Sequence, residues 1–201
     1  FKWYADMWAP LSESVFALVL SIIYFLLLPT LDSFYNFDIK SIFIIYFYNL
    51  FIMLFVAGGL HLYFYSYRKQ NNNLKYDNGN FLKNKNFLFN YQVYDNMFWS
   101  LISGVSVWTF YQFALFWAYA NEKITKIDFF INPLWFVFIF FIIIFFESIH
   151  FYFVHRLLHF KFFYKYFHYV HHKNVNTGPW SGISMHPIEN IIYQSSPLIH
   201  F

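Results

Sequence analysis

Histidine is the residue whose spacing in this chain suggests chemistry. The chain has 9 histidines and no cysteine, so thiolate ligands are excluded, and imidazole and carboxylate groups remain as metal ligands. Two histidines, His61 and His200, stand alone, and we expect them to be structural hydrogen-bonding residues. The others gather in one short stretch and are His150, His155, His159, His168, His171, His172 and His186.

Two clusters within this stretch have helical spacing. His155 and His159 are four residues apart, and on a helix with about 3.6 residues per turn their rings lie on one face. In the second cluster, His168 is followed after three and four residues by His171 and His172. Neutral imidazole is the commonest ligand of iron, zinc and copper. The clusters therefore predict a metal site, and their pairing suggests two metals.

One alternative for the clusters is a basic helix at the membrane surface. Arg156, Lys161 and Lys165 are interleaved with the histidines, as in helices that bind anionic lipid. Glu147 and His150 lie further upstream in an apolar segment, where ionisable groups usually face the protein interior or a cavity. We expect these two side chains to pair with each other rather than to bind the metal directly.

The elements that must position these residues are membrane helices. Of the 201 residues, 59% are hydrophobic and only 11% charged, against about 25% charged in soluble domains. A helix needs about 20 apolar residues to cross a bilayer. Spans are predicted at about residues 11–28, 39–67, 97–120 and 133–155, with a polar loop at 68–96. The expected fold is all-α, a polytopic bundle of about four transmembrane helices over residues 1–146, followed by a histidine-rich region at 147–201.

The distribution of basic residues predicts an orientation. Three of them, Lys40, Lys123 and Lys126, fall on one side of the membrane. The other side holds Lys2, Arg68, Lys69, Lys75, Lys83, Lys85, Arg156, Lys161, Lys165 and Lys173. Because basic loops stay on the cytoplasmic side, the histidine-rich region is expected there. The small net charge of +3 and the scattering of basic residues among apolar runs argue against a nucleic-acid surface.

Three strings of residues resemble one known family. They are Y-F-V-H-R-L-L-H, F-H-Y-V-H-H-K-N and G-P-W-S-G-I-S-M-H-P-I-E, and they are similar to the sterol desaturase and fatty acid hydroxylase superfamily over residues 147–201. The first two match the family motifs H-x(3 or 4)-H and H-x-x-H-H. His186 stands where relatives often place a further histidine followed by proline. The resemblance thus implies six metal ligands, which are His155, His159, His168, His171, His172 and His186.

Two positions depart from the family pattern. Ser148 stands beside Glu147 where relatives commonly have an aspartate, and no third histidine cluster follows His186. Because the chain begins with Phe1 and ends in an apolar stretch, we expect it to be part of a longer protein that carries the third cluster. The alternative is a relative that has lost part of the site and its activity.

The resemblance also implies a reaction. The family members are O2-dependent oxidoreductases that hydroxylate or desaturate a sterol or fatty acyl lipid at a di-iron centre, with zinc a possible substitute in purified protein. Electrons are expected from NAD(P)H through a cytochrome b5-type donor. No catalytic residue beyond the metal ligands and no separate cofactor-binding residue is predicted. Glu147, Glu189 and Asn174 are candidates to accept hydrogen bonds from ligand rings.

Two other functions remain open on the sequence. The chain could be a structural subunit of a larger membrane complex that keeps the fold without turnover. It could also be a haem-binding bundle, since paired histidines on membrane helices supply axial ligands. The expected location is the endoplasmic reticulum membrane, with a mitochondrial membrane as second choice, and the expected partners are the bilayer, an apolar lipid and the electron donor.

Overall fold

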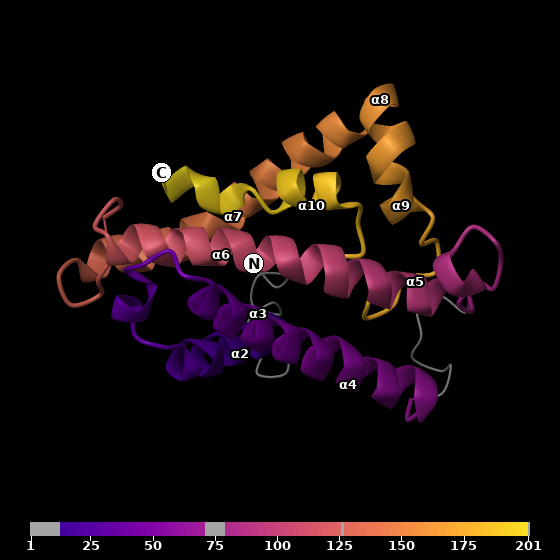
Figure 1. The fold of residues 1–201 in the computed structure, drawn as a ribbon, viewed down its shortest axis with the longest axis horizontal. Helices are drawn as coiled ribbons and strands as arrows, with labels where there is room; N and C mark the ends of the chain where they lie inside the picture. The colour runs from indigo at the N-terminus through magenta and orange to yellow at the C-terminus, as the bar shows by residue number, and fades with distance from the viewer. Residues whose placement is uncertain (1–12, 71–78, 126, 201) are drawn as a thin grey trace, which may run out of the picture.

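The described chain is built of helices. A computed structural model describes residues 13–70, 79–125 and 127–200, and within these ranges it has helices and irregular segments but no strand (Figure 1). The predicted all-α class is therefore confirmed. Three helices are long and apolar enough to cross a membrane, and they are Ile39–Ser66, Gln92–Ala120 and Pro133–Leu158.

The N-terminal helices form one layer of the molecule. Helix α2 (Glu13–Leu27) is apolar but has only 15 residues, so the first predicted span is shorter in the described residues than a full crossing. A turn of 3-10 helix, η1 (Leu31–Phe34), leads to the first long helix. That helix begins at Asp38, whose Oδ1 accepts a hydrogen bond from the backbone N–H of Ser41 at 2.8 Å. Such a side-chain cap satisfies an N–H group that the helix cannot pair.

Two of the long helices are continuous but locally widened. Turns of π-helix alternate with α-helix along both, and such turns insert a residue without breaking the helix. The first runs through α3 (Ile39–Met53), η2 (Leu54–Gly58), α4 (Gly59–His61) and η3 (Leu62–Ser66). The second, preceded by the short turn η4 (Leu88–Asn90), runs through α5 (Gln92–Trp99), η5 (Ser100–Gly104) and α6 (Val105–Ala120).

A buried polar network joins α2 and α3 to α6. The Asn49 side chain is 0% exposed, and its amide nitrogen donates to Thr109 Oγ1 at 3.1 Å and to Gln112 Oε1 at 2.9 Å. The Tyr24 hydroxyl lies 2.7 Å from Asn49 Oδ1 and 3.0 Å from Gln112 Oε1. Polar side chains that satisfy one another in this way hold membrane helices together. One helical turn before Asn49, Ile45 packs with Phe34 and Phe113 in an apolar cluster.

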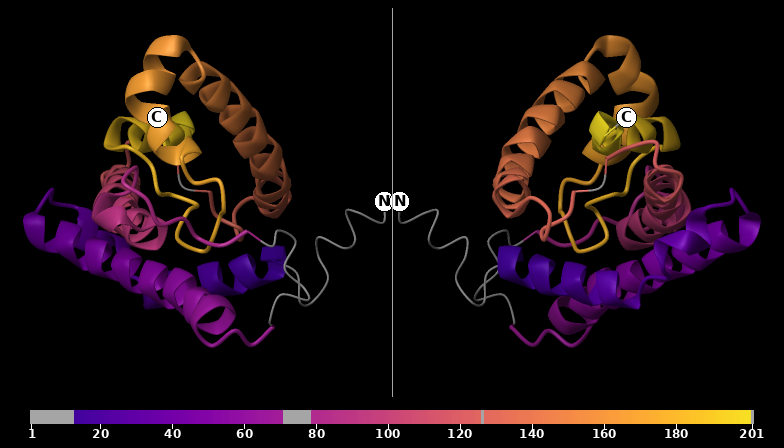
Figure 2. Two further views of the ribbon diagram at one scale, coloured as in Figure 1. Left: turned by 90° about the vertical axis from the view of Figure 1, so that its right-hand side faces the viewer. Right: turned by 90° about the vertical axis from the view of Figure 1, so that its left-hand side faces the viewer.

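The third long helix, α7 (Pro133–Leu158), starts with proline in its first turn, where no N–H partner is needed. After it the chain reverses and returns along α6, on the side of α6 where α7 lies (Figure 1). The returning segment consists of α8 (Lys161–Phe163), η6 (Tyr164–His168), α9 (Tyr169–His172), α10 (Pro187–Tyr193) and η7 (Ser196–His200). Helix α10 contacts both α6 and α7, so it fills the wedge between them (Figure 2).

The returning segment sits tightly on the second long helix at Gly104. A Cβ atom at this position would lie 2.6 Å from Ile183 Cδ1 and 2.9 Å from the backbone oxygen of Ile183. We expect Gly104→Ala to destabilise the protein by about 1–3 kcal/mol, because backbone must move to relieve the overlap. The measurement is the thermal unfolding midpoint of the detergent-solubilised protein.

Gly59 provides the matched control for this substitution. It is also a helical glycine, but a Cβ atom there would meet nothing within 4 Å. Gly59→Ala should therefore leave the midpoint unchanged or raise it, since alanine is the better helix former. Equal midpoints for the two variants would show that the contact at Gly104 does not hold the returning segment.

Candidate metal centre

The first two histidines of the site come from the end of α7. His155 lies in its last turn, and His159 follows as the residue at its C-terminal end. Their separation by one helical turn places the Nε2 atoms 2.9 Å apart. The backbone N–H of His159 donates to the carbonyl oxygen of His155 at 3.1 Å, which holds His159 in register with the helix. The spacing predicted from the sequence thus brings these rings together.

The second pair comes from the reversed segment. After Phe160 the chain turns, and η6 and α9 carry His168 and His172 back toward the end of α7. The Nε2 atoms of these two residues lie 2.8 Å apart. His168 is only 1% exposed, whereas His172 faces the surface. One pair of rings on each element therefore approaches the same point.

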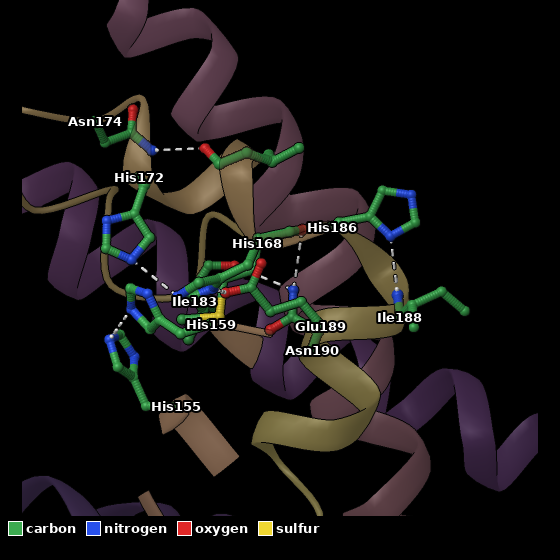
Figure 3. Close-up of polar contacts among 12 residues, drawn as sticks. His155, His159, His168, His172, Asn174, Ile183, His186, Ile188, Glu189 and Asn190 are labelled. Carbon is green, nitrogen blue, oxygen red and sulfur yellow. Dashed lines mark hydrogen bonds and ion pairs between the residues drawn. The ribbon is translucent and has the colours of Figure 1, made fainter. Parts of the chain in front are cut away.

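The four rings converge, as the close-up shows (Figure 3). One nitrogen from each of His155, His159, His168 and His172 lies within 4.8 Å of all the others. Two ligand nitrogens that bind one metal at about 2.1 Å and at a right angle are about 3 Å apart. The observed Nε2 separations of 2.8 and 2.9 Å match that spacing. Within each pair the nitrogens are therefore spaced as two ligands of one metal ion, and the four residues form a group that could hold such an ion.

A buried carboxyl group orients one of the rings. Glu189 Oε1 lies 2.7 Å from His168 Nδ1, and both side chains are 1% exposed. When Glu189 is ionised it only accepts, so His168 then donates its Nδ1–H and keeps Nε2 unprotonated toward the other rings. A carboxylate behind a ligand histidine is a recurring feature of metal sites, where it fixes the tautomer and raises the basicity of the ligand. Of the three candidates for this role, the structure brings Glu189 to a ligand ring.

Burial keeps the imidazoles neutral. Loss of hydration and, to a smaller extent, the neighbouring histidines together lower the pKa of His168, His171 and His172 to about 4. A histidine must be neutral to bind a metal, so these rings are ready to do so near neutral pH. Burial also raises the pKa of Glu189 to about 8, because a carboxylate in this interior loses its hydration.

Two of the six predicted ligands lie outside the converging group. His171 stacks on His168 with ring centroids 5.7 Å apart, and its Nδ1 is buried with no hydrogen-bond partner in the described residues. His186 begins α10, where its Nδ1 accepts a hydrogen bond from the backbone N–H of Ile188 at 3.2 Å. Its ring packs on Phe167 and Trp99. These two residues therefore do not share the point at which the four rings meet.

The other polar residues singled out in the sequence do not belong to the group of converging rings. His150 Nε2 lies 3.0 Å from Ser195 Oγ, a contact that the expected pairing with Glu147 did not foresee. Asn174 donates its side-chain N–H to the Val170 carbonyl at 3.4 Å, within its own helical turn. His61 stacks on Tyr65 and Phe81, far from the four rings in sequence. The side chain of His200 lies outside the described part.

An ion pair next to the second cluster was missed by the sequence analysis. Lys173 Nζ lies 2.8 Å from Asp95 Oδ1, and the aspartate is fully buried. Asp95 also accepts the backbone N–H of Leu88 at 2.9 Å. Because Lys173 directly follows His172, this pair ties the end of α9 to α5. The only signal in the sequence was an aspartate at the start of an apolar helix, whose partner lies 78 residues away.

These features define a helical membrane protein with a histidine cluster at the end of one spanning helix. Residues 138–201 match the family model described as fatty acid hydroxylase, and this match confirms the resemblance to the sterol desaturase and fatty acid hydroxylase superfamily. The matched segment contains all six predicted ligands and Glu189. No curated protein and no solved structure matches the chain. The family points to a membrane lipid hydroxylase or desaturase, and so to an oxidoreductase.

Proposed function

We propose that the protein is an O2-dependent lipid oxidoreductase that hydroxylates or desaturates a sterol or fatty acyl lipid with a histidine-ligated di-iron centre. The observation that carries the proposal is the convergence of His155, His159, His168 and His172 on one point. Iron bound by such a set of neutral ligands supplies the one-electron and O2 chemistry needed to attack an unactivated C–H bond. The family match supports the same class of reaction.

The chain's own residues would divide two tasks. The four converging rings would hold one iron, with Glu189 fixing the ring of His168. His171, whose buried Nδ1 has no partner in the described residues, is proposed as a ligand of the second iron. His186 is proposed to join it, which requires its ring nitrogen to leave the cap of α10. Further donors for the second iron would have to come from outside these residues.

A haem group fits this site less well than bare metal ions. Two axial imidazoles lie on opposite faces of a porphyrin, with nitrogens about 4 Å apart when each bond is about 2 Å. The Nε2 atoms within each pair are instead 2.8 and 2.9 Å apart. The two rings of each pair are therefore too close together to be the axial ligands of one haem.

The surroundings of the site suit a membrane enzyme. Spanning helices would present the apolar lipid to the cluster. Arg156, Lys161 and Lys165 are exposed and lie close to the clustered histidines in the sequence, on the proposed cytoplasmic side. A cytochrome b5-type donor supplied by NAD(P)H is the proposed source of electrons. The endoplasmic reticulum is the proposed location, with a mitochondrial membrane as second choice.

Metal analysis of the purified full-length protein tests the proposal. Plasma emission spectrometry should find about two irons per chain, or zinc in their place, as in two-metal sites. The His171→Ala, His172→Ala double variant should lose most of this metal, whereas His61→Ala should keep it. A wild-type protein that folds but binds no metal would contradict the enzyme and support a structural subunit. An absorption band typical of haem would contradict the di-iron centre.

A further inference from the structure

A cavity lies between α6, α7 and the segment that follows α10, and the metal site does not use it. Its volume is about 690 Å³, within the roughly 300–1,000 Å³ typical of ligand pockets. Most of its wall is apolar and aromatic. The polar residues that line it include Gln112, Glu147, His150, Tyr193 and Gln194, together with Tyr111, Ser148 and Ser196. Ionisable residues in a spanning helix are costly and usually serve a function. Glu147 and His150 therefore indicate that this cavity binds a ligand.

The cavity adjoins the histidine cluster through one shared side chain. Phe151 lines the cavity, and its ring lies 5.3 Å from the ring of His155 and 5.9 Å from that of Tyr193. Phe151 and His155 are one helical turn apart, which is about 6 Å along α7. A ligand in the cavity would thus reach toward the cluster past Phe151.

Some polar groups of the cavity wall already form hydrogen bonds within the protein. The donors and acceptors that remain determine which ligand the wall can bind. Gln112 Oε1 accepts hydrogen bonds from Tyr24 and Asn49, so its N–H groups are the ones it can offer. The amide nitrogen of Gln194 donates to the Gly104 carbonyl and to Asn190 Oδ1, which leaves its oxygen as an acceptor. The wall can therefore donate to a ligand from one side and accept from another.

This distribution selects among lipid classes. A hydroxyl or an amide both donates and accepts, and so can pair with Gln112 and with Gln194 or Glu147. A free carboxylate only accepts, and it would lie against the Glu147 carboxyl group in a low-dielectric wall, where like charges repel strongly. We propose that the cavity binds a lipid chain that carries a neutral hydroxyl or amide group, in preference to a free fatty acid. That this lipid is the substrate rests on the proposed function.

Photo-crosslinking of purified full-length protein in detergent micelles tests this binding site. The probes are a long-chain alcohol and the fatty acid of equal length, each with a mid-chain diazirine. The alcohol should label peptides that contain Phe151 or Tyr193, about tenfold more than the acid does. Excess unlabelled alcohol should compete with the label on the wild-type protein, so the result does not depend on any variant folding.

Two variants of cavity residues and one control variant test whether the labelling comes from the cavity. Leu115 lines the cavity, so Leu115→Trp should fill it and reduce labelling by about tenfold while metal content stays unchanged. Glu147→Gln should raise labelling by the acid toward that by the alcohol. Leu54 is exposed on another spanning helix, and Leu54→Trp should change neither probe.

Failure of the binding site and failure of the proposed function can be told apart. Labelling could instead appear in the larger apolar groove of about 1110 Å³ between α2 and α3, whose charged lining residue is Lys40. That result, or equal labelling by acid and alcohol, would overturn the proposed ligand even if the protein binds iron. Selective labelling of the cavity in a protein without metal would support the lipid site and contradict only the oxidase.

Discussion

His168→Ala should abolish metal binding, with the largest effect of any single substitution in the protein. The His168 ring lies within 4.4 to 4.9 Å, centroid to centroid, of the rings of His155, His159 and His172. It is also the ring that Glu189 orients. Its loss removes a nitrogen at the centre of the set and leaves a buried carboxyl group without its partner. That orphaned group alone should cost about 1–3 kcal/mol of stability.

Metal content per folded chain, measured after size-exclusion chromatography, checks this prediction. Because His168 is buried, part of the effect could come from instability, so His172→Ala serves as the second variant. His172 is on the surface, and its removal should lose the metal with little change in the unfolding midpoint. Full metal content in both variants would show that the four converging rings are not the ligands.

Replacing Glu189 should weaken metal binding in a graded way. The residue touches the His168 ring and acts through it, so we treat it as a positioning residue. Removal of such a carboxylate typically costs 10–100-fold in metal affinity, and we expect about that loss for Glu189→Ala. Glu189→Gln keeps an oxygen that accepts the Nδ1–H of His168, so it should recover part of the affinity. The expected order is wild type, then glutamine, then alanine.

Competition with a chelator gives the dissociation constants for this series. Asp32→Ala is the control, because Asp32 is an exposed acidic residue near the N-terminal helices. A purely structural role for Glu189 would lower the unfolding midpoint of both variants without separating their metal affinities. Equal affinities in the glutamine and alanine variants would therefore contradict the positioning role.

Hydropathy and helical spacing could predict much of the architecture. Apolar runs of about 20 residues with few charges leave a chain no stable alternative to helices in a membrane, and three such helices are present. The run that ends at Pro29 is equally apolar, but its described helix has only 15 residues. Helix boundaries depend on local caps and turns, which hydropathy does not report.

The contents of the histidine site could be predicted only in part. Spacing by one turn brings His155 to His159 and His168 to His172, because residues four apart share a helix face. His171 precedes His172 by one residue and so points about 100° away around the helix. His186 belonged to the same predicted set, but its ring nitrogen is engaged at the start of α10. A family motif does not reveal such local competition for a side chain.

The sequence by itself determined the helical class, the membrane setting and the two histidine pairs, because each follows from interactions within one segment. Only the tertiary structure decided that the pairs meet, that Glu189 stands behind His168, and that Lys173 pairs with Asp95. These contacts join residues 21 and 78 positions apart. They exist because the chain reverses after α7 and lays α10 between α6 and α7, and no local periodicity encodes that packing.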